Sequence, residues 1–91
     1  MPASPTILCV DDEPIVLTSL REQFERHLGG YEVEVAQDAA EALEILATLT
    51  EQGVPIPVVI SDHIMPGMKG DELLVRVHEQ LPDTRTILLT G

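Results

Sequence analysis

Residues 58–70 read VVISDHIMPGMKG, and this stretch gives the clearest structural signal in the chain. It opens with three β-branched apolar residues, which predict a buried central strand over residues 58–61. The apolar run stops at Asp62, and a turn follows at once. Four residues are expected to shape that turn, because Pro fixes its own φ and Gly permits a positive φ or a close backbone approach. They are Met65, Pro66, Gly67 and Gly70. Asp62 is therefore either the first solvated residue after a strand or a carboxylate held in place for chemistry.

The flanking sequence alternates between strand and helix patterns. Strands are expected at residues 6–10, 31–36 and 86–89, and helices at residues 14–28, 38–49 and 71–81. Asp38 and Glu41 fit a capping box at the start of the second helix. This alternation predicts an α/β fold, a three-layer, doubly wound parallel sheet with right-handed crossovers and helices on both faces.

Each predicted helix has an apolar face at helical spacing. In the first helix this face holds Val16, Leu20, Phe24 and Leu28, with Leu17 widening it, and in the third it holds Leu74, Val77 and Leu81. These faces are expected to pack on the sheet.

Polar residues follow the predicted strands at one edge of the sheet. The first strand ends in Asp11 and Asp12, the third in Asp62 and the fourth in Thr90. In parallel α/β sheets, ligands bind beyond the carboxyl ends of the strands, near the point where strand order reverses. Two carboxylates about 4 Å apart repel by roughly 4 kcal/mol at an effective dielectric of 20. Three carboxylates together therefore require a proton or a cation, and an all-oxygen site suits Mg²⁺ better than zinc.

Mg²⁺ on carboxylates usually serves phosphate chemistry. An Asp carboxylate is a competent nucleophile toward a phosphoryl group, and the product is an aspartyl phosphate. Such a site needs a metal, a hydroxyl donor and backbone N–H groups. Asp62 as nucleophile, Mg²⁺ on Asp11 and Asp12, the Thr90 hydroxyl and the amides after Asp62 and at Gly91 would supply these parts.

Composition narrows the possible partners. The 91 residues hold 16 acidic and 5 basic side chains, for a formal net charge of -11. That balance argues against direct binding to nucleic acids or to an anionic membrane surface. The single cysteine, Cys9, lies in an apolar run and is expected to be a buried, inert thiol. Because the chain has neither a signal-peptide pattern nor a long apolar run, a cytoplasmic location is expected.

At this point the sequence resembles the receiver domain of two-component response regulators. The residues that carry the resemblance are ILCVDDEP at 7–14, VVISDHIMPGMKG at 58–70 and ILLTG at 87–91. The resemblance implies a flavodoxin-like fold with strand order 2-1-3-4-5. It also implies that Asp62 accepts a phosphoryl group from a histidine kinase or a histidine phosphotransfer protein, and that an output domain lies in the same parent chain.

The resemblance assigns further roles at the site. Asp12 and Asp62 would ligate Mg²⁺ directly, Asp11 would act through water, and Ile64 would offer its backbone carbonyl. Thr90 would be the switch residue that reaches the phosphoryl group. The backbones of His63, Ile64 and Gly91 would contact the phosphoryl oxygens.

The sequence departs from the family pattern at its end. Residues 1–91 are expected to form the N-terminal three-quarters of a receiver, with the fifth strand and last helices missing. The family's active-site Lys and aromatic switch residue would lie beyond Gly91, and Lys69 sits in the wrong loop to replace the Lys. The apolar strand at residues 86–89 would then be an open edge, so a chain of these residues alone is expected to be poorly stable or to dimerise by exchange.

Three other functions compete with a signalling switch. A Mg²⁺-dependent phosphatase or phosphotransferase could also form an aspartyl phosphate, but that class usually carries an Asp-x-Asp motif and a cap domain. A nucleotide or flavin binder lacks support because no glycine-rich phosphate loop follows any strand. A degenerate receiver used only for protein contacts does not explain the intact set of Asp11, Asp12, Asp62 and Thr90. The chain itself is expected to be regulatory rather than an enzyme.

Overall fold

The computed structural model describes residues 4–63 and 67–89 of the chain. Its elements are β1 (Thr6–Val10), α1 (Pro14–His27), β2 (Glu32–Ala36), α2 (Ala39–Glu51), β3 (Val58–Asp62), α3 (Gly70–Gln80) and β4 (Arg85–Leu89). Every strand and helix expected from the sequence is present, and the boundaries differ by at most one or two residues.

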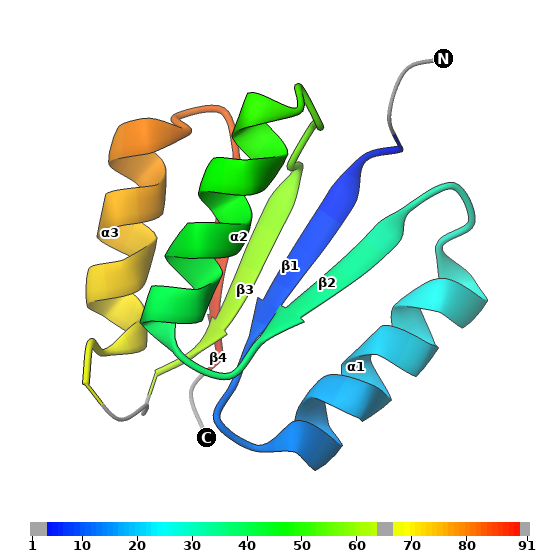
Figure 1. The fold of residues 1–91 in the computed structure, drawn as a ribbon. Helices are drawn as coiled ribbons and strands as arrows, with labels where there is room; N and C mark the ends of the chain where they lie inside the picture. Colours follow the sequence, from blue (N-terminus) through cyan, green and yellow to red (C-terminus); the bar gives the residue numbers. More distant parts are fainter. Residues whose placement is uncertain (1–3, 64–66, 90–91) are drawn as a thin grey trace.

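The four strands form one parallel sheet in the order β2-β1-β3-β4 (Figure 1). This order confirms the flavodoxin-like arrangement expected for the first four strands. The chain moves from β1 outward to β2 and then crosses back to β3 on the other side of β1, so the order reverses between β1 and β3. That point is where α/β sheets of this kind bind ligands.

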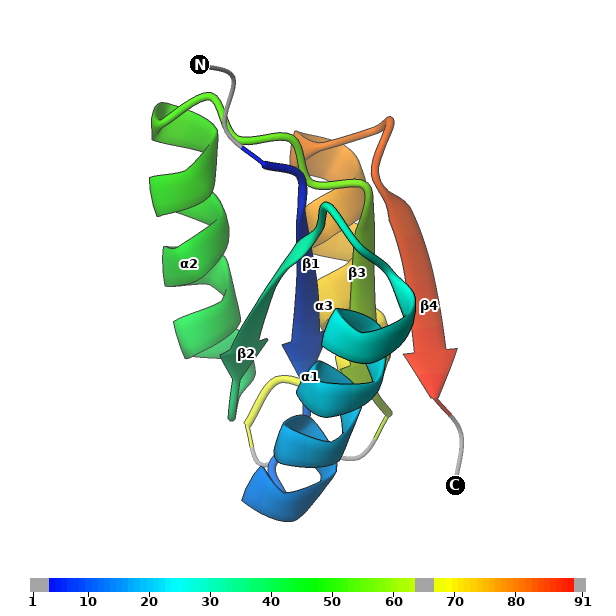
Figure 2. The ribbon, with the colours of Figure 1, turned by 90° about the vertical axis from the view of Figure 1, so that its right-hand side faces the viewer.

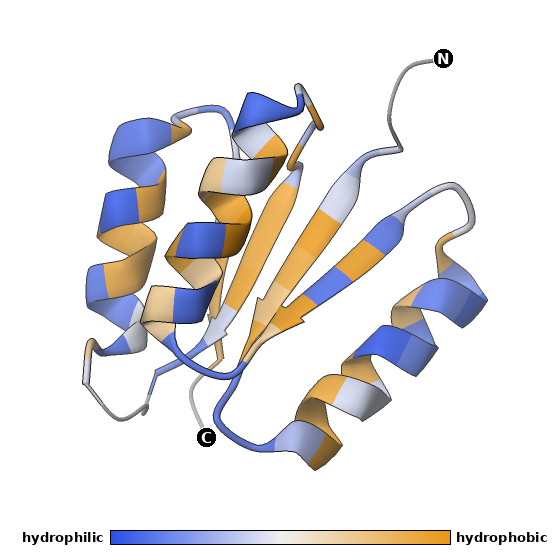
Figure 3. Ribbon diagram, viewed as in Figure 1, coloured by the Kyte–Doolittle hydropathy of each residue, from blue (hydrophilic) through white to orange (hydrophobic). Residues whose placement is uncertain are grey.

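The helices cover both faces of the sheet, so the domain has three layers (Figures 1 and 2). α1 packs on β1 and β2 from one face, whereas α2 contacts β1 and β2 and α3 contacts β3 and β4 from the other. Figure 3 shows the apolar stripe of each helix and the apolar central strands.

Alternate residues of β1 supply two separate cores. Leu8 and Val10 join the core beneath α2 and α3, and Ile7 and Cys9 join the core beneath α1. All five residues of β1 are buried, as expected for a central strand covered on both faces. Burial raises the pKa of the Cys9 thiol to about 11, with Arg21 opposing the shift, so the thiol stays protonated.

Most residues of the predicted helix faces pack on the two cores as expected: Leu17, Leu20 and Phe24 of α1, and Leu74, Val77 and Leu81 at α3. In α1 the most buried residue is Leu17, while Leu28 follows the helix and is 39% exposed. In α3 the sheet-facing residues are Gly70, Leu73 and Val77, which lie at i, i+3 and i+7. Leu74 is one position further round the helix; it is half-buried and packs against the edge of the same core.

Both outer strands expose backbone edges within the described part of the chain. At β2 the Arg21 guanidinium donates a hydrogen bond of 3.2 Å to the Val33 carbonyl, and Glu32 and Glu34 are exposed. At β4 the side chains of Ile87 and Leu89 are 45% and 39% exposed on the face of the sheet that carries α1. β4 is thus the apolar open edge expected from the sequence. None of the described helices has the length and apolar character that crossing a bilayer requires.

Candidate functional site

Strand register places two of the predicted site residues side by side. Val10 of β1 pairs with Ser61 of β3, so the next residues, Asp11 and Asp62, leave adjacent parallel strands at the same level. Side chains alternate along a strand, and equal parity puts these two carboxylates on the same face. Asp12 follows in the loop that leads into α1. The sheet itself therefore brings together the residues that the sequence placed at strand ends.

The three carboxylates form a compact oxygen cluster. One oxygen each from Asp11, Asp12 and Asp62 lies within 4.8 Å of the other two. Asp11 is buried, Asp62 is half-buried and Asp12 is exposed, so the cluster runs from the sheet edge into solvent. It is the one group of this kind found among residues 4–63 and 67–89. Three hard oxygen donors at this spacing fit a cation such as Mg²⁺, which prefers carboxylates and retains water ligands.

Backbone hydrogen bonds hold Asp11 in its position. Its amide donates to the Ala36 carbonyl at 3.1 Å, which extends the β1–β2 ladder by one residue. Its side-chain Oδ1 accepts from the Glu13 amide at 2.8 Å, just before Pro14 begins α1. The carboxylate is therefore oriented before any ligand arrives.

Electrostatics at Asp11 indicate the need for a counter-charge. Burial raises the pKa of the Asp11 carboxyl above its usual 3.8 and the hydrogen bond from the Glu13 amide opposes this, while Asp62, Asp12 and Glu13 raise it further through charge repulsion. The folded, metal-free domain thus disfavours the ionised form of Asp11 more than the unfolded chain does. A bound divalent cation would relieve this repulsion.

This shift predicts a pH dependence of stability in the metal-free domain. Because the folded state holds the Asp11 proton more tightly than the unfolded chain, stability falls as pH rises from 3.8 through the raised folded-state pKa, then levels off. Asp11→Asn keeps the acceptor oxygen for Glu13 and removes the charge. In EDTA at pH 7 its Tm should exceed that of the unsubstituted domain, and the difference should vanish below pH 3.8. Asp83→Asn, at an exposed turn position, is the control, and a lower Tm for Asp11→Asn would contradict the repulsion.

Hydrogen bonds hold the end of β3 on two sides. The Ser61 side chain is fully buried, and its hydroxyl donates to the Asp62 carbonyl at 3.0 Å. The His63 amide donates to the Leu89 carbonyl at 3.2 Å, and the His63 carbonyl accepts from the Gly70 amide at 3.2 Å. Asp62 therefore projects from a segment held by β4 on one side and by the start of α3 on the other.

The His63 amide does not fit the phosphoryl contact expected for it. It continues the β3–β4 ladder, because its N–H points toward β4 and is bonded to Leu89. The His63 ring lies partly buried, and its Nδ1 has no hydrogen-bond partner among the described residues. In this structure His63 thus belongs to the support of the site.

Gly67 and Gly70 serve the β3–α3 connection in different ways. Gly67 has φ of 80°, in the left-handed region that favours glycine. At Gly70 the constraint is space, because an added Cβ would collide with the Asp62 carbonyl oxygen and would lie 2.9 Å from its carbon and 3.0 Å from Leu88 Cδ1. α3 can approach the end of β3 this closely only with glycine at position 70.

Gly70→Ala should therefore destabilise the domain and displace the Asp62 backbone. Overpacking of a rigid site costs about 1–3 kcal/mol, which in a domain of this size corresponds to a drop in Tm of roughly 10 °C. Thermal unfolding followed by circular dichroism measures it. Gly29→Ala is the matched control, because no atom lies within 4 Å of its added Cβ. Equal stability of the two variants would show that the close approach at Gly70 is unimportant.

Several predicted site residues lie outside the described part of the chain. They are Ile64, Met65 and Pro66 in the β3–α3 connection, and Thr90 and Gly91 after β4. Their predicted roles stay predictions. The last described residue of β4, Leu89, pairs with Asp62.

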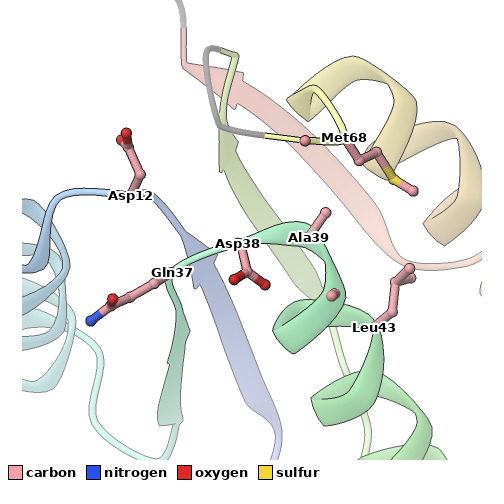
Figure 4. Close-up of a pocket in the computed structure, with 8 residues that line it drawn as sticks. Asp12, Gln37, Asp38, Ala39, Leu43 and Met68 are labelled. Atoms are coloured by element: carbon pink, nitrogen blue, oxygen red, sulfur yellow. The ribbon is translucent and has the colours of Figure 1, made fainter.

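Near the cluster lies a hollow of about 580 Å³. Figure 4 shows residues that line it. Asp12 borders both the cluster and the hollow. Ala39 and Leu43 of α2 and Met68, just before α3, supply apolar side chains to its wall, and the Asp38 carboxylate lies at the start of α2. Sequence reasoning did not find this hollow, because its walls come from three loops and helix ends that are distant in the chain.

Comparison with known proteins identifies the family. Residues 7–91 match the model of the response regulator receiver domain, which is nearly the whole chain. The chain belongs to the response regulator receiver domain family. This assignment agrees with the strand order, the switch point between β1 and β3 and the carboxylate cluster at that edge.

Relatives of this receiver occur as parts of larger proteins. The C4-dicarboxylate transport transcriptional regulatory protein DctD of Pseudomonas aeruginosa is 38% identical over 89 residues, which cover 98% of this chain and 18% of DctD. A signal receiver domain of an HD domain-containing protein from Pseudomonas fluorescens has 38% identity and a TM-score of 0.83, covering 97% of this chain and 65% of that one. The present receiver thus spans less than two-thirds of either protein.

A third relative is described with both a metal complex and a kinase. The response regulator TrrA of Thermotoga maritima, solved in complex with Mg²⁺-BeF, has 34% identity and a TM-score of 0.80, covering 94% of this chain and 69% of TrrA. TrrA has also been solved in complex with the histidine kinase ThkA. Receiver domains as a class are regulatory phosphoacceptor domains.

Proposed function

We propose that this receiver accepts a phosphoryl group on Asp62 from a histidine kinase or a histidine phosphotransfer protein, and thereby switches an output domain in its parent chain. The observation that carries this proposal is the meeting of Asp11, Asp12 and Asp62 within 4.8 Å at the carboxyl edge of the sheet. Two of these carboxylates come from adjacent strands and one from a loop, so the arrangement depends on the fold.

The transfer itself is a displacement at phosphorus. An oxygen of the Asp62 carboxylate attacks the phosphorus of a phosphohistidine, the P–O bond forms and the P–N bond breaks, with its electron pair passing to the imidazole nitrogen. The carboxylate needs no general base for this step, so positioning and charge stabilisation are what the protein must supply. The buried Ser61 hydroxyl and the His63 backbone supply positioning, because they fix the backbone from which Asp62 projects.

Mg²⁺ is the proposed cofactor. Asp12 and Asp62 would hold it directly, Asp11 through water, and the Ile64 backbone carbonyl would complete the protein ligands. When bound, the ion would neutralise carboxylate repulsion and draw charge from the phosphoryl oxygens. Asp11, already oriented by its hydrogen bond from Glu13, would hold a metal-bound water without rearrangement.

The remaining assignments extend the same proposal beyond the described residues. The Thr90 hydroxyl would reach the phosphoryl group, and the Ile64 and Gly91 amides would donate to its oxygens. Met65 and Pro66 would shape the loop. Residues 1–91 would form most of one cytoplasmic receiver whose fifth strand pairs with the open edge of β4. That domain would regulate rather than catalyse, and a chain lacking the fifth strand could dimerise by exchange at β4.

Acetyl phosphate tests the proposal directly on the full-length natural protein. With Mg²⁺, incubation should add the mass of one phosphoryl group per receiver, and the product should be cleaved by hydroxylamine, as acyl phosphates are. Borohydride reduction followed by peptide mass spectrometry should place the modification at Asp62. Continuous release of phosphate without an accumulating adduct would instead favour the phosphatase considered above, and neither adduct nor release would refute both.

A further inference from the structure

β2 forms one of the two outer edges of the described sheet, and a side chain of α1 lies against that edge. The Arg21 guanidinium donates a hydrogen bond of 3.2 Å to the Val33 carbonyl. We propose that the outer edge of β2 is a latent surface for pairing with β2 of a second copy of this chain, and that Arg21 keeps this surface closed. Neither Arg21 nor Val33 takes part in the phosphoryl transfer proposed above.

Strand register shows that the Val33 carbonyl faces away from the sheet. The Ala36 carbonyl accepts a hydrogen bond of 3.1 Å from the Asp11 amide, so Ala36 directs its backbone groups toward β1. Alternate residues of a strand direct these groups to opposite sides, so Val33 and Val35 direct theirs outward. The described sheet has no strand beyond β2 (Figure 1). The carbonyl that the guanidinium occupies is therefore one that an added strand would need.

The packing of α1 brings Arg21 to this edge. Arg21 lies one turn after Leu17, the buried residue of α1, so both side chains lie on the same side of the helix. Arg21 is half-buried and lines a hollow of about 260 Å³ between α1 and β2, together with Val35. A guanidinium stays charged and offers five N–H donors, so it bonds a carbonyl while its other donors remain hydrated. The contact therefore forms wherever α1 is docked on the sheet.

Charge guards the other face of the same strand. Glu32 and Glu34 are exposed on the side of β2 that faces α2, and pairing of β2 with its copy would bring these like charges together. The edge of β4 differs, because its exposed residues on the α1 face, Ile87 and Leu89, are apolar. No side chain in the described ranges hydrogen-bonds the outer backbone of β4. The sheet thus directs strand addition to β4 and opposes it at β2.

Arg21 and Arg26 of α1 offer a matched pair of substitutions. Arg21→Met removes the donor to Val33 and keeps an unbranched apolar stem between α1 and β2. Arg26 is exposed in the last turn of the same helix, so Arg26→Met serves as the control. Met is as compatible with a helix as Arg, and both substitutions make the net charge more negative by one. The two variants therefore differ in the contact at the β2 edge.

The experiment measures self-association of the full-length natural protein and its two variants by sedimentation velocity. The buffer holds about 1 M NaCl, where the Debye length of about 3 Å suppresses repulsion between the copies. Arg21→Met should raise the association constant at least tenfold, whereas Arg26→Met should stay within twofold of the unsubstituted protein. Hydrogen exchange followed by mass spectrometry locates the contact. Peptides that span residues 32–36 should gain protection with rising protein concentration in Arg21→Met alone.

Three results would overturn the guarding role of Arg21. The first is an equal association constant for Arg21→Met and Arg26→Met. The second is stronger association of Arg21→Met with no concentration-dependent protection of β2, which would place the contact on another surface. The third is association accompanied by lower protection throughout the domain, which would assign it to unfolding. Stronger association with protection gained at β2 is the result that supports a closed pairing surface.

Discussion

Asp62→Asn is expected to lose phosphorylation by acetyl phosphate entirely, to less than about one-hundredth of the unsubstituted rate. The substitution keeps the size of the side chain and the hydrogen bond from Ser61 to the backbone carbonyl of residue 62. What it removes is the nucleophilic carboxylate oxygen, for which a neutral amide is no replacement. Intact-mass spectrometry in Mg²⁺ measures the result, and Asp83→Asn, at an exposed position after α3, should be labelled normally.

Asp62→Glu sharpens the same prediction, because it retains the charge and moves it outward by one methylene. A misplacement of about 1 Å can cost on the order of 100-fold in rate when catalysis depends on positioning. Asp62→Glu should therefore be nearly as inactive as Asp62→Asn while folding normally. Labelling of either variant at the unsubstituted rate would mean that a different residue accepts the phosphoryl group.

The second large effect expected is stabilisation by Mg²⁺. An ion that binds only the folded state stabilises it by about 2.7 kcal/mol at 100 times its Kd, which corresponds to a rise in Tm of roughly 10–20 °C for a domain of this size. The three converging carboxylates make the folded state the binding form, since the unfolded chain does not hold Asp62 near Asp11 and Asp12. Thermal unfolding of the full-length natural protein across a Mg²⁺ titration measures the rise.

Asp12→Asn should remove most of that rise. Asp12 is exposed, so the substitution leaves the core unchanged and deletes one proposed ligand. Matched NaCl controls for ionic strength, because screening alone also relieves repulsion among surface acids. Equal Tm values for the unsubstituted protein in millimolar Mg²⁺ and in matched NaCl would contradict the metal site, and an unchanged response in Asp12→Asn would remove Asp12 from it.

The sequence predicted the elements of this fold well because their signals are local. Apolar runs bounded by acids or turns mark β1 and β3, and the Asp38 cap marks the start of α2. The convergence of Asp11 and Asp62 was also predictable, since both follow parallel strands and such strands end at a common edge. The Asp-x-x-Met-Pro pattern that begins at Asp62 also indicated the receiver domain family.

Features that depend on side-chain placement across elements were not predictable. The sheet-facing role of Leu73 depends on how α3 sits over β3 and β4, which periodicity alone leaves uncertain by one position. The contact between Gly70 and the Asp62 carbonyl joins a helix start to a strand end. The amide of His63 was expected at the phosphoryl group, but the ladder to Leu89 continues one residue past β3. The supporting role of Ser61 had one indication in the sequence, because it is a polar residue within an apolar run.

The burial of β1 on both faces has a consequence for how this receiver tolerates sequence change. All five residues of β1, Thr6–Val10, are buried, and residues 7–10 join the two cores in alternation, so none of the five positions faces solvent. In a library of all single substitutions, residues 6–10 should therefore not tolerate charged side chains. The next two positions, Asp11 and Asp12, should not tolerate apolar side chains. Deleting a single residue from this strand would exchange its two faces and draw Asp11 into the buried place of Val10. The positions of Asp11 and Asp12 in the sequence are thus fixed by the alternation of side chains between the two faces of β1.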